Sequence, residues 1–346
     1  MEKFNFLPGP VNIHADTLAC FAEVPISHRC GEFESLLADT RARLKNLVNT
    51  NECAVFTGSG TLANDVIGAQ LSLQKERGLV LSNGEFGERL AAQAERFSLK
   101  FSHLKYPWGA HFDYDEIRKY FEAHHPAWIW FAHFETSTCV LNDIKKLCAI
   151  AKEYGAKVCV DAVSSIGNME LDLSEVNLAS ASSGKGLACL AGLSFVFSNR
   201  APKSAERLPK YLDMGFSLEN GGLPFTISSN HVAALNAELV RMNLQARMSA
   251  TKKISARLKE FSGQIGFKII GAEDFMLTFE MPPASDSLKF GDYLAARGVA
   301  IHYKNAYLAR RNWVQLALMG YPSERGAERF IDIADSFFAK NIQKNS

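Results

Sequence analysis

Short apolar runs alternate with stretches of helical periodicity between about residues 50 and 200, and this alternation restricts the chain to few architectures. The apolar runs lie at 54–56, 79–81, 128–131, 157–160 and 193–197, and helix-like segments separate most of them. Short apolar strands that alternate with helices are typical of a mainly parallel sheet covered on both faces. The sequence therefore predicts an α/β fold for this part of the chain.

The pattern changes after about residue 240. Helices are expected there near 247–261, 287–297 and 323–340, and apolar runs lie at 267–270, 275–279, 299–303 and 314–318. A chain of 346 residues exceeds the usual size of one domain. We therefore expect a large domain over residues 1–240 and a small α+β domain over residues 241–346, with residues 1–20 packing on the small domain.

The composition argues against several classes of partner. The chain has 38 Lys and Arg residues against 37 Asp and Glu residues, which gives a net charge of +1. Proteins that bind nucleic acid or membrane surfaces normally carry a basic excess or patch. No apolar run approaches the roughly 20 residues of a membrane span, and the N-terminus lacks the apolar core of a secretory signal. A cytoplasmic protein is expected.

Seven scattered cysteines form no CxxC pair. An odd number of cysteines, mostly within apolar stretches, indicates reduced thiols packed in the core rather than a metal site.

One glycine-rich loop follows the first apolar run of the predicted sheet. The backbone N–H groups and two hydroxyls of Gly58-Ser59-Gly60-Thr61 could hold a phosphate at the start of a helix. The same loop loosely fits a dinucleotide-binding pattern, but the next strand ends in Leu81-Ser82 without the acidic residue that would hold a ribose. A nucleotide-binding protein remains an alternative that rests on this loop alone.

An aspartate and a lysine stand where parallel strands end. Asp161 closes the apolar run at 157–160, and Lys185 follows 24 residues later among small residues. Burial could lower the pKa of such a lysine and leave a nucleophilic amine. An Asp–Lys pair of this kind suits pyridoxal phosphate (PLP), because a carboxylate keeps the pyridine nitrogen protonated and a lysine can carry the cofactor as a Schiff base.

Eight segments of the chain match, in order, the motifs of one enzyme family, the class V aminotransferases. This family includes the alanine–glyoxylate, serine–glyoxylate and 2-aminoethylphosphonate–pyruvate transaminases. The matching segments are Pro8-Gly-Pro10, Ser27-His-Arg29 with Glu32-Phe33, Thr57-Gly-Ser-Gly-Thr61, Asn83-Gly84 with Phe86-Gly87 and Arg89, His133-x-Glu135-Thr-Ser-Thr138, Val160-Asp-Ala-Val-Ser164, Ser182-Ser-Gly-Lys185 and Pro224-Phe-Thr226. The chain thus resembles this family over most of its length.

The resemblance implies a PLP-transferase fold of type I and an enzyme that transfers an amino group between a small amine or amino acid and an oxo acid. It implies that Lys185 forms the Schiff base with PLP and that Asp161 pairs with the pyridine nitrogen. Phe86 has the place of the aromatic residue that stacks on the ring.

The remaining roles that the resemblance implies concern the edge of the cofactor and the substrate. Ser59, Gly60 and Thr61 would hold the phosphate, and Thr226 would reach it from the neighbouring subunit of a homodimer. Thr136 would hydrogen-bond the ring hydroxyl. Gly9 and Gln315 are predicted to contact the substrate.

Gln315 is also where the chain departs from the family. Most members carry an arginine four residues before a Met-Gly pair, and it clamps the substrate carboxylate; here Met319-Gly320 is preceded at that distance by Gln315. A neutral amide cannot replace a charge-assisted bidentate contact. Arg310 or Arg311 would supply the contact if the local alignment shifts. The departure also leaves open a PLP-dependent lyase or decarboxylase acting on a different substrate.

Overall fold

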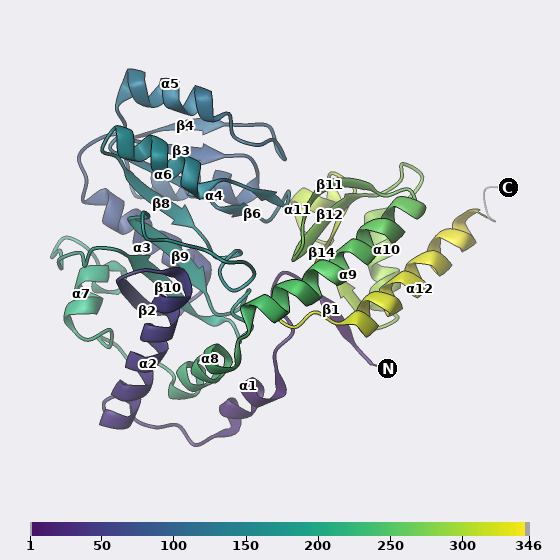
Figure 1. Ribbon diagram of the computed structural model, residues 1–346, viewed down its shortest axis with the longest axis horizontal. Helices are drawn as coiled ribbons and strands as arrows, with labels where there is room; N and C mark the ends of the chain where they lie inside the picture. The colour runs from purple at the N-terminus through teal and green to yellow at the C-terminus, as the bar shows by residue number, and fades with distance from the viewer. Residues whose placement is uncertain (1, 343–346) are drawn as a thin grey trace.

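The computed structural model describes residues 2–342 and shows two lobes that the long helix α9 (Leu244–Gln264) connects (Figure 1). In the larger lobe, seven described strands form one sheet. Their order is β2 (Glu52–Gly58), β10 (Gly192–Ser198), β9 (Leu178–Ser182), β8 (Lys157–Asp161), β5 (Trp128–Ala132), β3 (Gly78–Ser82) and β4 (Phe101–Lys105).

The sheet is mainly parallel, as the sequence predicts. The neighbours from β9 across to β4 all pair in parallel, and β10 alone runs antiparallel to the two strands beside it. Parallel strands end at the same edge, so the residues that follow β2, β3, β5 and β8 are brought together there. The predicted α/β fold class is confirmed.

Helices cover both faces of this sheet, because its central strands are apolar on both sides. In β5, Trp128 and Trp130 pack into one core and Ile129 and Phe131 into the other. The first core is covered by α3 (Gly60–Ser72) and α4 (Glu85–Arg96), and the second by α2 (Gly31–Val48), α5 (Tyr114–His124), α6 (Ile144–Glu153) and α8 (Ser229–Arg241).

The smaller lobe has its own core around an antiparallel sheet of β11 (Lys268–Glu273), β12 (Met276–Glu280) and β14 (Trp313–Ala317). It also contains α9, α10 (Ser287–Ala295) and α12 (Glu324–Ile342). The N-terminal strand β1 (Phe4–Phe6) pairs in parallel with β13 (Val299–Ile301) of this lobe. The domain boundary near residue 240 stays a prediction.

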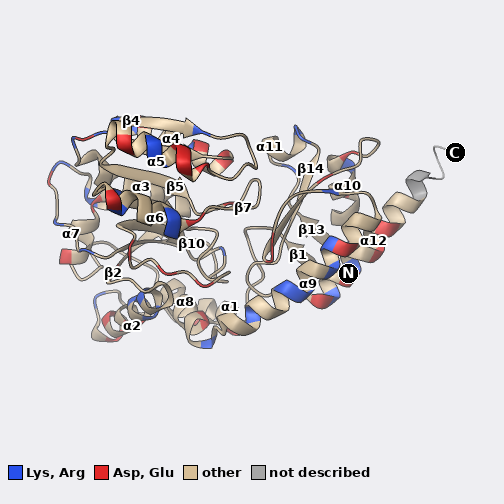
Figure 2. Cartoon of the chain, turned by 45° about the horizontal axis from the view of Figure 1, so that its top comes forward, with Lys and Arg blue, Asp and Glu red and all other residues tan. Residues whose placement is uncertain are grey.

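Short elements complete the chain, and they are α1 (Ala15–Ala19), β6 (Phe134–Glu135), β7 (Val140–Leu141), α7 (Met214–Glu219) and α11 (Ala306–Ala309). Basic and acidic residues are interspersed on the helices of both lobes (Figure 2). None of the helices within residues 2–342 is both long and apolar enough to span a membrane.

A buried carboxylate joins the two ends of the α8–α9 connection. The side chain of Glu238 is fully buried on α8, and its Oε1 accepts a hydrogen bond from Arg247 Nη2 on α9 at 2.8 Å. Arg247 Nη1 also donates to the carbonyl oxygen of Gly186, next to Lys185, at 2.6 Å. Tyr321 donates to the same carboxylate. This network fastens α9 to the loop that carries Lys185.

Replacing Arg247 by Met should therefore destabilise the protein strongly, because Glu238 would lose a buried charged partner. We expect a loss of roughly 3 kcal/mol in the free energy of unfolding, measured by urea denaturation. Arg257→Met is the matched control on the same helix, since Arg257 and Glu328 form a half-exposed pair. That change should cost less than about 1 kcal/mol. Equal losses in the two variants would contradict the role given to Arg247.

Candidate active site

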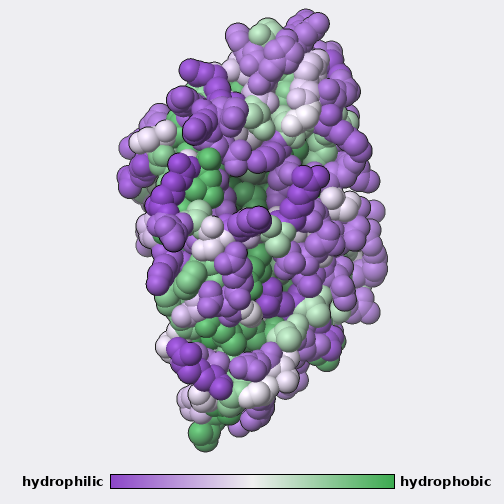
Figure 3. Space-filling view, turned by 90° about the vertical axis from the view of Figure 1, so that its left-hand side faces the viewer, coloured by the Kyte–Doolittle hydropathy of each residue, from purple (hydrophilic) through white to green (hydrophobic). Residues whose placement is uncertain are grey.

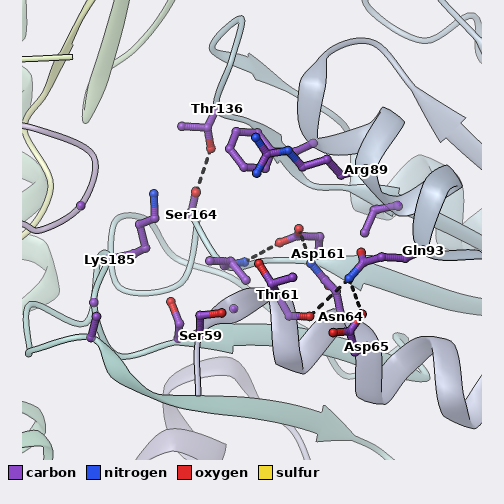
Figure 4. A pocket seen from close by; sticks show the side chains of 18 of the residues that line it. Ser59, Thr61, Asn64, Asp65, Arg89, Gln93, Thr136, Asp161, Ser164 and Lys185 are labelled. Atoms are coloured by element: carbon purple, nitrogen blue, oxygen red, sulfur yellow. Dashed lines mark hydrogen bonds between the residues drawn. The ribbon is translucent and has the colours of Figure 1, made fainter. Parts of the chain in front are cut away.

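A cavity of about 680 Å³ lies at the carboxyl edge of the large sheet, where most of the predicted site residues meet (Figure 4). Eight of the ten predicted residues line it, and they are Gly9, Ser59, Gly60, Thr61, Phe86, Thr136, Asp161 and Lys185. They come from six separate segments of the chain. Thr226 and Gln315 are not among the lining residues.

Asp161 is the last residue of β8 and is held by neutral donors. Its Oδ2 accepts a hydrogen bond from Asn64 Nδ2 at 2.8 Å, and its Oδ1 accepts one from the backbone N–H of Val163 at 3.0 Å. Asn64 in turn accepts a hydrogen bond from the Ser180 hydroxyl on β9. Asn64 was not predicted as a site residue, because a helical asparagine carries no signal until the fold brings it to Asp161.

Burial raises the pKa of Asp161, whereas its hydrogen bonds and the charge of Lys185 act in the opposite direction. Within the described residues, no lysine or arginine nitrogen lies within 4.0 Å of this carboxylate. A cationic partner placed in the cavity would stabilise its charged form. The protonated nitrogen of a pyridine ring is a partner of that kind, so the carboxylate fits the predicted cofactor.

Lys185 lies in the connection between β9 and β10 and is partly accessible from the cavity. Burial lowers its pKa to about 8, with the charge of Arg89 acting in the same direction and Asp161 against it. Gly9 lies beside this amine, since a Cβ at that position would lie 3.7 Å from Nζ and 3.5 Å from the carbonyl oxygen of Gly184, which is ordinary contact distance. A lysine with this pKa is partly neutral near pH 8 and can act as a nucleophile.

The N-terminus of α3 opens into the same cavity. Ser59 adopts an extended conformation as the N-cap, and its side chain makes no capping hydrogen bond. Within the described chain, the N–H groups of Gly60 and Thr61 have no hydrogen-bond acceptor, as is usual in the first turn of a helix. A Cβ at Gly60 would lie 2.8 Å from the methyl carbons of Val163. Free N–H groups at a helix N-terminus suit a phosphate.

Glu135 connects the residue predicted to stack on the cofactor with the neighbouring lining residue Thr136. Its fully buried carboxylate accepts hydrogen bonds from the backbone N–H groups of Phe86 at 3.1 Å and Gly87 at 2.9 Å. It also accepts hydrogen bonds from the N–H and hydroxyl groups of Ser137. Burial raises the pKa of Glu135, and these donors lower it. The sequence shows the motif His133-x-Glu135-Thr-Ser-Thr138 that contains Glu135. The contacts of Glu135 with the first turn of α4 could not be predicted from the sequence.

Two further lining groups restrict the walls of the cavity. Thr136 donates a hydrogen bond to the Ser164 hydroxyl at 2.8 Å, so its orientation is fixed by the loop that follows Asp161. The guanidinium carbon of Arg89 lies 5.0 Å from the centroid of the Phe86 ring. Arg89 therefore lies over the aromatic ring.

Thr226 lies away from this cavity within its own chain. Thr226 is exposed and borders a smaller pocket together with Tyr211 and Phe225. The rings of Tyr211 and Phe225 stack with their centroids 4.9 Å apart. The predicted phosphate contact from a neighbouring subunit stays a prediction.

Figure 3 shows the face of the molecule that lies at the left of Figure 1. On this face, apolar side chains lie in hollows between polar side chains.

The position of Gln315 argues against the predicted substrate contact. It is fully buried in β14, and its Nε2 donates hydrogen bonds to the carbonyl oxygens of Thr136 and Ser137 and to the Thr278 hydroxyl. Its Oε1 accepts a hydrogen bond from His302 Nδ1 at 2.8 Å, if that nitrogen carries the proton. The amide is thus fully engaged within the protein, joining β14 to the segment that carries Thr136.

Arg310 and Arg311 do not take the place of Gln315 in the strand. Thr278 of β12 pairs with Gln315 in a continuous register, and the two arginines precede β14, just after α11. The two arginines therefore lie outside the strand position that Gln315 occupies.

Comparison of the sequence with known protein families assigns the chain to one of them. The family profile described as "Aminotransferase class-V" matches residues 20–218. The chain therefore belongs to the class V aminotransferase family, and the resemblance drawn from its motifs is confirmed. Pyridoxal phosphate is the cofactor that this membership implies, and the residues around the cavity fit it.

Three similar proteins illustrate the relationship. The small subunit of a soluble hydrogenase from Synechococcus sp. (strain PCC 6716) is 31% identical over 255 residues, which cover 69% of this chain and 66% of that protein. The L-aspartate–glyoxylate aminotransferase of Paracoccus denitrificans (strain Pd 1222) is 29% identical, with 68% and 64% covered. The structure of an aspartate aminotransferase from Thermus thermophilus superposes with a TM-score of 0.88, at 26% identity, and covers 96% of this chain and 99% of that one.

The matches to the first curated relatives span slightly less than two thirds of those proteins, 65–66% of their length. The fold, by contrast, is shared over nearly the whole chain, and it is that of the PLP-dependent aminotransferases of fold type I.

The Glu135 network predicts a contrast between two buried serines. The Ser137 hydroxyl donates a hydrogen bond to the Glu135 carboxylate and accepts one from the backbone N–H of Glu85 at 3.0 Å. The Ser194 hydroxyl on β10, by contrast, has no hydrogen-bond partner among the described residues. Ser137→Ala should lower the free energy of unfolding by about 1–3 kcal/mol, and Ser194→Ala should leave it nearly unchanged. Urea denaturation of the two variants measures the difference. Equal effects would mean that the network contributes little.

Proposed function

We propose that this protein is a PLP-dependent aminotransferase that moves an amino group between a small amine or amino acid and an oxo acid. One observation carries the proposal, namely that Asp161, Lys185 and the free N-terminus of α3 line one cavity. A basic amine, a buried carboxylate and an anion-binding helix end are what the aldehyde, the ring nitrogen and the phosphate of PLP require.

The roles of the residues follow from their chemistry. When bound, PLP supplies an aldehyde that captures amines and a ring that accepts electrons from the bond being broken. Lys185 would hold the cofactor through its amine, and the same amine would move the substrate proton as a general base. Asp161 keeps a proton on the ring nitrogen, because the buried carboxylate gains a cationic partner there.

Other residues orient and enclose the site. Ser59, Gly60 and Thr61 hold the phosphate at the positive end of the α3 helix dipole. The ring of Phe86, which lines the cavity, would pack against the cofactor ring and exclude water from it. Thr136 donates to or accepts from the ring hydroxyl while remaining bonded to Ser164.

The wider assembly belongs to the same proposal. We infer a homodimer in which Thr226 of each chain reaches the phosphate of the other, in keeping with its exposed position outside its own cavity. A cytoplasmic location agrees with the balanced charge, and residues 1–240 and 241–346 are the proposed PLP-binding and small domains. Small amino acids and oxo acids are the proposed substrates, as the names of relatives such as the Paracoccus enzyme suggest.

The alternative of a PLP-dependent lyase or decarboxylase rested on Gln315. In the structure Gln315 joins β14 to the segment that carries Thr136. The relatives with named enzymatic activities include several aminotransferases, and this favours the main proposal.

Replacing Lys185 by Ala should abolish both covalent PLP capture and amino transfer. PLP-loaded protein reduced with borohydride and digested should carry the cofactor mass on the peptide containing Lys185. Transfer from a panel of amino donors to glyoxylate or pyruvate is then measured for wild type and variant. Lys157→Ala, which removes an exposed lysine of β8, is the control and should keep both properties. Attachment at another lysine, or equal activity of the Lys185 variant, would refute the assignment.

The pKa of Lys185 predicts how PLP capture depends on pH. Because burial lowers this pKa to about 8, the neutral amine predominates above that pH and the ammonium below it. The rate of PLP capture by the cofactor-free protein should rise about tenfold from pH 7 to pH 9 and then level off. A short lysine peptide, measured in parallel, corrects for the titration of PLP itself. A rate that keeps rising beyond pH 10 would indicate an unperturbed lysine.

A further inference from the structure

A second cavity, of about 640 Å³, adjoins the first. It lies between α4 and the segment that runs from α11 to the start of β14, so the two lobes both contribute to its walls. Arg89 lines both cavities. The two cavities therefore meet at this side chain.

The second cavity is basic. Its lining includes Arg89, Lys105, Arg310 and Arg311 against two acidic residues. Each of these acids already has a cation, because Glu85 pairs with Arg89 and Glu88 with Lys105, both at 2.9 Å. Arg310 and Arg311 have no carboxylate within 4.0 Å among residues 2–342. Two guanidinium groups thus border a cavity without an anionic partner from the described chain.

Arg311 is held in place before any ligand arrives. Its guanidinium carbon lies 3.8 Å from the centroid of the Trp108 ring, and its Nη1 donates to the carbonyl oxygen of Tyr307 at 3.1 Å. Trp108 is itself fixed by a hydrogen bond from its Nε1 to Glu88 at 2.8 Å. A planar guanidinium whose orientation is set by stacking presents its remaining N–H groups as a fork for a carboxylate or phosphonate.

The two arginines also lie near the strand position that carries an arginine in most members of the family. The strand position that would carry a cation is occupied by Gln315, a neutral residue whose amide is fully engaged. His302 and Tyr307 stand between Gln315 and the second cavity, with their ring centroids 6.1 Å apart, and Tyr307 lines that cavity. Arg96, which borders the first cavity, and Arg310 and Arg311, which border the second beyond Tyr307, are the lining arginines without a carboxylate partner among the described residues.

We propose that the second cavity binds an anionic group at the end of the substrate remote from its amino group, with Arg310 and Arg311 as its partners. The substrates are then short amino compounds that carry a carboxylate or phosphonate at the far end, and the corresponding oxo acids. The inference rests on the proposed aminotransferase function, because the amino end has to reach Lys185.

Binding of unreactive anions tests the inference without relying on turnover. PLP-loaded wild-type protein is titrated calorimetrically with succinate and with butyrate, which have equal chain length but two and one carboxylates. Succinate should bind at least tenfold more tightly than butyrate. In Arg310→Gln/Arg311→Gln, succinate affinity should fall about ten- to a hundredfold, since charge-assisted hydrogen bonds are lost, and butyrate affinity should change little.

Matched controls separate this role from packing. Arg297 stacks on Tyr293 at 3.5 Å on the small lobe, and Arg329 is exposed, so Arg297→Gln/Arg329→Gln removes two comparable arginines that line neither cavity. This variant should bind succinate like wild type. The melting temperature and the PLP absorption band of each variant show whether it is folded and loaded.

Kinetics with amino donors gives a second readout. L-aspartate and L-alanine differ by one carboxylate, and the ratio of their kcat/KM values should fall at least tenfold in the Arg310/Arg311 variant. Equal affinity of wild type for succinate and butyrate, a preference that survives in the variant, or an equal loss for both anions would each overturn the inference. Failure of every amino donor to react, with succinate binding intact, would instead count against the proposed function.

Discussion

The structure depends on two opposite charges placed at the buried edge of one sheet. Asp161 ends β8, and Lys185 follows β9. Because these neighbouring strands pair in parallel, their pairing places the backbone of both residues at the same edge of the sheet. Burial alone disfavours both charged forms, raising the pKa of the acid and lowering that of the amine. Each charge partly stabilises the other across the cavity. A cofactor with a cationic ring nitrogen and an aldehyde would satisfy both groups at once.

The surroundings of these charges are organised by buried polar side chains rather than by apolar packing. Asn64 connects Asp161 to β9, Glu135 connects β6 to the first turn of α4, and Arg247 fastens α9 beside Lys185. Each of these side chains makes several hydrogen bonds, so each fixes the relative position of segments far apart in the sequence. These hydrogen bonds therefore fix the segments that carry the cavity walls relative to one another.

Much of this could be predicted from the sequence, because the alternation of apolar strands with helices and the order of short motifs are local features. Asp161, Lys185, Phe86 and the Ser59–Thr61 loop were found in this way, and all line the cavity. The hydrogen bonds of Gln315 could not be predicted, since they depend on the approach of β14 to residues 136–137. The same holds for the stacking of Arg311 on Trp108, which joins segments about 200 residues apart in the chain.

The most direct measurement is the visible spectrum of PLP-loaded protein mixed anaerobically with L-aspartate or L-alanine in the absence of any oxo acid. Our account predicts that the band of the lysine-bound cofactor disappears as an equimolar amount of pyridoxamine phosphate forms, and that it returns on addition of an oxo acid. An Asp161→Asn variant should bind PLP but complete this change far more slowly. A band that persists, or a donor consumed without formation of pyridoxamine phosphate, would contradict the account.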